Sequence, residues 1–100
     1  MTMDFKIPSK YTIGGQDVKV EFVESDGEDY GNYTHAKGIL KICKKAGDTP
    51  QSDTSQLNTF FHELIHSILR TMGEYELNAN DKFVNCFAGF LTEAIRTMEE

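Results

Sequence analysis

Apolar and polar residues alternate along the first quarter of the chain. Between Tyr11 and Glu24, the apolar residues Val18, Val20 and Phe22 are separated by charged residues and follow the turn-forming tetrad Gly14–Asp17. Alternation with a period of two places the apolar side chains on one face of a strand, and the glycines supply the turn. The segment is therefore predicted to form a β-hairpin.

A third strand is predicted from about His35 to Lys44, where a short apolar run ends in lysines. Lysines suit the edge of a sheet, so this strand is predicted to lie at an edge. The polar, glycine-containing stretches at 25–31 and 46–55 are predicted to be a loop and a linker. The linker would end in a helix cap at Thr54 or Ser55.

In the second half of the chain, apolar residues recur at helical spacing and predict two long helices. The first runs from about 55 to 72, before Gly73, and the second from about 81 to 98, with Asn78 or Asn80 as its N-cap. The residues predicted to be buried on these helices are Leu57, Phe60, Phe61, Leu64, Ile65, Ile68 and Met72, then Phe83, Val84, Phe87, Phe90, Leu91, Ala94, Ile95 and Met98.

Three strands followed by two helices predict an α+β fold, with a small three-stranded sheet (the hairpin plus an edge strand) packed on two long helices. The chain has 100 residues, the size of one ordinary domain, so residues 1–100 are predicted to form a single domain. No internal repeat is visible.

Composition narrows the classes of function. Sixteen acidic against ten basic residues give a formal net charge of −6, which argues against nucleic acid as the partner. No apolar run approaches the roughly 18 to 20 residues that span a bilayer, and Met1–Lys10 has no apolar signal-peptide core. Cys43 and Cys86 lack the spacing of a zinc ribbon or redox pair. We expect a cytoplasmic protein with reduced thiols that does not bind membranes.

The candidate chemistry lies on the first predicted helix, in the sequence His62-Glu63-Leu64-Ile65-His66. Histidines at i and i+4 are about 40° apart around a helix, so both can reach one ion. A catalytic zinc site needs a third protein ligand and keeps its fourth position for water. Glu63 would be the general base that takes a proton from that water. The histidines could also hold a structural or vestigial metal, and iron, cobalt or nickel would accept similar ligands.

The third ligand stays open at this stage. Asp81 shares a stripe with apolar residues of the second helix, which predicts that its carboxylate points toward the first helix. It could instead be an acidic residue favoured by the helix dipole. Glu76 is the second candidate and Glu74 the third. Donors to a developing oxyanion could come from His35, Tyr33 or Tyr75.

The segment from Thr59 to Ile68 resembles the motif helix of gluzincin-like, ImmA/IrrE-type small metallopeptidases of phages and mobile elements. Asp81–Ala88 looks like the Glu-x-x-Ala-x-x-Phe-Ala second helix of that family, with Asp81 in place of the usual Glu. The resemblance implies a minimal zincin-like domain in which His62, His66 and Asp81 bind zinc. It also implies that Gly38–Cys43 is the edge strand that lines the cleft and pairs with an extended peptide.

The leading hypothesis is a zinc-dependent metallopeptidase that cleaves a protein or peptide substrate, with Glu63 as general base. The alternative is a non-catalytic, zincin-fold interaction protein of a phage or mobile element, with a structural or absent metal. The chain could also be one subunit of a larger assembly, and the sequence leaves the oligomeric state open.

Overall fold

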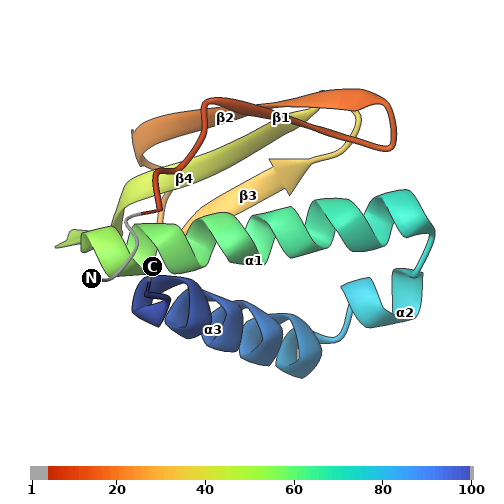
Figure 1. The fold of residues 1–100 in the computed structure, drawn as a ribbon. Coiled ribbons are helices and arrows are strands. Elements are labelled where there is room, and N and C mark those ends of the chain that lie inside the picture. Colours follow the sequence, from red (N-terminus) through yellow and green to blue (C-terminus); the bar gives the residue numbers. More distant parts are fainter. Residues whose placement is uncertain (1–4, 100) are drawn as a thin grey trace.

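A β-sheet covers one side of helix α1 and helix α3 covers the other, so the computed structural model has three layers (Figure 1). The structure describes residues 5–99, and residues 1–4 and 100 of the predicted single domain lie outside this range. The elements follow one another as β1 (Lys10–Ile13), β2 (Gln16–Ser25), β3 (Gly31–Thr34), β4 (Ile39–Ala46), β5 (Thr49–Pro50), α1 (Asp53–Met72), α2 (Tyr75–Asn78) and α3 (Asp81–Thr97).

The prediction of a three-stranded sheet on two helices is wrong, although the α+β class holds. The sheet has five strands in the order β1-β2-β4-β3, with β5 paired to β4. It is mixed, because β2 and β4 are parallel and the other pairs are antiparallel. The predicted hairpin is β1–β2. The additional strands β3 and β5 have only four and two residues, too few for an alternating pattern to reveal them.

The predicted edge strand is in fact interior. Strand β4 pairs with β2 on one side and with β3 on the other, and its Leu40 and Ile42 side chains are completely buried. Lys44 and Lys45 are exposed where the strand ends. Such lysines mark the end of β4 rather than a free edge, and the edge strand beside α1 is β3.

Helix α1 begins earlier than predicted because Ser52 is its N-cap, in place of Thr54 or Ser55. The Ser52 hydroxyl oxygen accepts the backbone N–H of Ser55 at 3.1 Å. At the other end, Gly73 adopts the left-handed conformation with φ of 78°, which confirms the predicted helix end.

The segment between the two long helices contains the short helix α2, which the polar sequence did not predict. Helix α3 begins at Asp81 as predicted. Asn80 is its N-cap, and the Asn80 side-chain oxygen accepts the backbone N–H of Phe83 at 3.0 Å.

The core forms on both faces of α1. Its buried apolar residues are Val18, Val20, Leu40, Ile42, Leu57, Phe60, Phe61, Ile65, Leu69, Val84 and Ala88. Helix α3 is an outer layer that contacts only other helices, so one face of it is buried. The prediction that Phe87 and Phe90 are core residues is therefore wrong: their exposed fractions are 50% and 71%. Met72 and Met98 are also exposed.

Candidate metal centre

The two motif histidines of α1 direct their ring nitrogens at each other. The Nε2 atoms of His62 and His66 lie 3.2 Å apart, and both side chains are half-buried. Zinc–imidazole bonds of about 2.0–2.1 Å at a tetrahedral angle place two such nitrogens about 3.3 Å apart. The pair thus fits two ligand positions of one zinc ion.

Asn78, at the end of α2, orients one of these rings. Its side-chain oxygen Oδ1 lies 2.7 Å from Nδ1 of His66. An amide oxygen only accepts hydrogen bonds, so Nδ1 of His66 donates, and the lone pair on its Nε2 can accept the N–H of His62 or bind a metal in its place. Partners of this kind fix the tautomer of metal-binding histidines. Sequence reasoning considered Asn78 only as a cap, because no local pattern relates it to His66.

Burial favours the neutral, metal-binding form of the other histidine. The pKa of His62 is lowered mainly by burial and further by His66, while the negative charge of Asp81 opposes the shift. A neutral imidazole has the lone pair that a metal needs.

The structure does not bring a third ligand into contact with the histidines. Within residues 5–99, no three His, Cys, Asp or Glu side chains are grouped closely enough to hold a metal. Asp81 is exposed at the start of α3, so its carboxylate is not buried against α1 as predicted. Glu74 and Glu76, on either side of the first residue of α2, are also exposed. Asp81 is the one of these candidates whose charge acts on His62.

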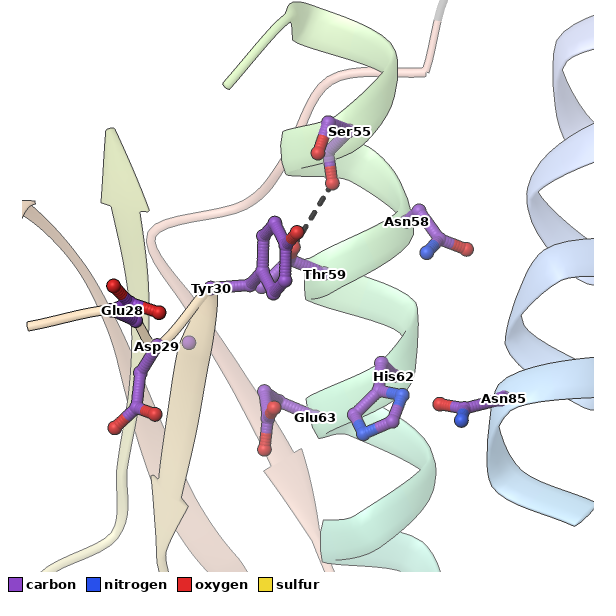
Figure 2. Close-up of a pocket in the computed structure, with 10 residues that line it drawn as sticks. Glu28, Asp29, Tyr30, Ser55, Asn58, Thr59, His62, Glu63 and Asn85 are labelled. Atoms are coloured by element: carbon purple, nitrogen blue, oxygen red, sulfur yellow. Dashed lines mark hydrogen bonds between the residues drawn. The ribbon is translucent and has the colours of Figure 1, made fainter. Parts of the chain in front are cut away.

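Glu63 is a buried carboxyl on the sheet side of α1, whereas His62 lies on the α3 side (Figure 2). The exposed fraction of Glu63 is 8%. Burial, and to a smaller extent the negative charge of Asp29, raises the pKa of Glu63 to about 7. A general base is most effective when its pKa lies near the working pH. The position is therefore suited to accepting a proton near neutral pH.

A pocket of about 640 Å³ opens beside Glu63 and His62, between strand β3 and helix α3 (Figure 2). Its wall includes the acidic residues Glu28 and Asp29 on the segment before β3. Asn85 lies on the α3 side of this pocket in Figure 2.

Gly31 allows strand β3 to approach α1 closely. A Cβ atom at this position would lie 2.5 Å from Cγ2 of Thr59, 2.6 Å from the carbonyl oxygen of Lys41 and 3.5 Å from Cγ of Glu63. Sequence reasoning placed Gly31 at the end of a loop. A glycine inside a strand often marks such a close approach, but the strand itself was too short to recognise.

A second pocket, of about 350 Å³, lies on the His66 side of Glu63. Two of the three predicted oxyanion donors line it: the hydroxyl of Tyr33 is 2.8 Å from Nδ1 of His35. Burial raises the pKa of Tyr33, and the charge of Arg70 opposes this. Tyr75 is outside the pocket lining and is 63% exposed.

A scan against protein-family models found no match, and searches of curated proteins and of solved structures found no similar protein. In the described part of the chain, no helix is long and apolar enough to cross a membrane.

Proposed function

We propose that this chain is a zinc-dependent metallopeptidase of the HExxH type. The observation that carries the proposal is the convergence of the His62 and His66 Nε2 atoms at 3.2 Å beside the buried carboxyl of Glu63. Each of the two pockets that Glu63 lines contains one of these histidines, and a buried carboxylate is unfavourable without a partner. A metal-dependent hydrolytic site needs this combination.

Each residue has a distinct role in the proposed reaction. His62 and His66 hold the metal, Asn78 orients His66, and Asp81 is the proposed third ligand. Bound zinc would supply the Lewis acidity that makes a water molecule nucleophilic near neutral pH. Glu63 accepts the proton of the attacking water and returns a proton to the leaving amine.

Strand β3 offers a place for an extended substrate. It ends the strand order beside α1, and its residues Gly31 and Tyr33 line the pockets on either side of Glu63. A peptide added to this edge through backbone hydrogen bonds would pass in front of the Glu63 carboxyl. We therefore propose a peptide or protein substrate, and the role expected for Gly38–Cys43 passes to β3.

The experiment combines metal content with peptidase activity. Zinc is measured by mass spectrometry on untagged wild type, His62→Ala, Asp81→Ala and Glu63→Gln, with Glu93→Gln on the exposed face of α3 as the matched control. We expect about one zinc per chain in wild type, Glu63→Gln and Glu93→Gln, and loss in the other two variants. Among the proteins that bind zinc, only Glu63→Gln should lose activity, and its rate of labelled-casein hydrolysis should be roughly 10²- to 10⁴-fold below that of wild type.

Other outcomes have defined meanings. Zinc that persists in Asp81→Ala would move the third ligand to Glu76 or Glu74, which alanine variants of each would separate. A wild type that binds zinc but shows the same hydrolysis as Glu63→Gln would contradict the peptidase proposal.

The incomplete ligand set favours one alternative, a non-catalytic interaction protein with a structural or absent metal. The group of three ligands that a catalytic zinc requires is not assembled within residues 5–99. A wild type that cannot be loaded with zinc, and that binds a protein partner without cleaving it, would support this alternative.

We also propose that the protein acts in the cytoplasm. Cys43 and Cys86 are both free thiols, the form that cysteines keep in a reducing compartment.

A further inference from the structure

The two pockets that meet at Glu63 differ in the charged residues that line them. The larger one is lined by the carboxylates of Glu28 and Asp29. The smaller one contains Arg70 and His35, and Glu63 is the one acidic residue of its lining.

Arg70 is placed one helical turn after His66, so both side chains lie on the same side of α1. Its guanidinium carbon lies 5.5 Å from the centre of the Tyr75 ring, a contact that helps to orient the cation. The ion pairs found within residues 5–99 join Lys10 to Asp17 and Lys44 to Glu24. Within that range, the Arg70 guanidinium therefore has no carboxylate partner.

The rest of this pocket, called here the Arg70 pocket, is polar. The hydroxyl of Tyr33 and the ring of His35 are held together by their hydrogen bond, and the wall also includes the amides of Asn32 and Asn78 and the ring of His66. An arginine fork with neighbouring hydroxyl and amide donors matches the geometry of a carboxylate.

We propose that the Arg70 pocket binds a carboxylate of the substrate close to the scissile bond. This inference rests on the proposed function, because it names the substrate class of the same site. The lining of the Arg70 pocket includes Gly31 and Glu63, so a carboxylate bound there lies beside the peptide bond that Glu63 would act on. The carboxylate comes from an acidic side chain or from the C-terminus of the peptide.

The test measures binding separately from cleavage. Zinc-treated Glu63→Gln protein is titrated with fluorescent octapeptides, and anisotropy gives the dissociation constant. One peptide carries an internal Glu three residues from an internal Lys with an amidated C-terminus, a second reverses their order, a third replaces Glu by Gln, and a fourth has a free C-terminal carboxylate as its only acid. Tighter binding of the first two peptides identifies an acidic side chain as the source of the carboxylate. Tighter binding of the fourth identifies the C-terminus.

We expect the best acidic peptide to bind at least roughly tenfold tighter than its Gln counterpart, as a charge-assisted hydrogen bond predicts. Adding Arg70→Gln should abolish this preference, and Arg70→Lys should retain part of it, since the charge remains but the fork is lost. Arg96→Gln, at an exposed arginine of α3, is the matched control and should leave the preference unchanged.

Equal affinity of the Gln peptide and of all three carboxylate-bearing peptides, no binding of any peptide, or an unchanged preference in Arg70→Gln would each overturn the inference. Failure of the proposed function looks different. In that case the preference depends on Arg70, but zinc-loaded wild type leaves every bound peptide intact.

Discussion

The buried carboxyl of Glu63 should make the metal-free protein less stable as the pH rises. Its folded pKa is about 7 against an ordinary value of 4.5, because burial and then Asp29 disfavour the charged form. The contribution of the neutral Glu63 carboxyl to the unfolding free energy is fully present below its pKa in the unfolded chain. It is lost as the pH rises through its pKa in the folded protein. For this pKa shift, proton linkage predicts that the unfolding free energy falls by about 1 kcal/mol by pH 5 and by about 3 kcal/mol by pH 8.

Glu63→Gln keeps the shape of the side chain and removes this titration. In chelator-treated protein we expect the variant to gain about 2 to 3 kcal/mol of unfolding free energy over wild type between about pH 5 and pH 8. Urea denaturation followed by circular dichroism at several pH values measures the difference. The contribution of the histidines cancels in this difference because both proteins contain them.

Glu93→Gln is the control, because the carboxylate of Glu93 is exposed on α3. It should follow the wild-type pH dependence throughout. If Glu63→Gln and wild type keep a constant difference from about pH 5 to pH 8, then the carboxyl is not desolvated as described and the argument for its raised pKa fails.

Three further predictions test other parts of the site and its support. Asn78→Ala should weaken zinc binding by roughly 10- to 100-fold, because His66 loses its orienting partner. Competition with a chelator dye measures the zinc affinity, and an unchanged affinity would exclude that role for Asn78. Gly31→Ala should destabilise the fold by about 1 to 3 kcal/mol in urea titrations, since backbone and side-chain atoms occupy the space of the added methyl group. An unchanged unfolding free energy would contradict the close approach of β3 to α1. Burial raises the pKa of Tyr11 to about 12, and its hydrogen bond to Ser67 opposes the shift. Wild type should therefore lose stability above about pH 10, the unfolded pKa, and Tyr11→Phe should lose less; parallel curves would refute this.

The parts of the fold that depend on local sequence were predictable. The hairpin, the two long helices, the Gly73 helix end and the Asn80 cap follow from periodicity and capping chemistry, which act within a few residues. The parallel pairing of β2 with β4 was not predictable, because it joins strands separated by β3 and no local signal specifies it.

The candidate site shows the same division. The spacing of His62 and His66 on one helix follows from the sequence alone, since a helix fixes their relative positions. The contact of Asn78 with His66 and the approach of Gly31 to Glu63 depend on how α2 and β3 pack on α1. The position of Asp81 was misjudged for a related reason: a stripe along α3 does not say how closely its first turn packs on α1, and Asp81 is exposed there.

The layer order explains why the candidate site lies on α1 and not on α3. A helix packed on both sides has only a narrow strip open to solvent, and in α1 that strip runs along β3 past Glu63. A carboxyl in such a strip is desolvated yet reachable, the two conditions that raise its pKa and let it meet a substrate. Helix α3 is packed on one side only, so a carboxylate on it, such as Asp81, stays hydrated. In the proposed site, a metal bound by His62 and His66 would give that carboxylate a charged partner, so we expect metal binding itself to bring in the third ligand.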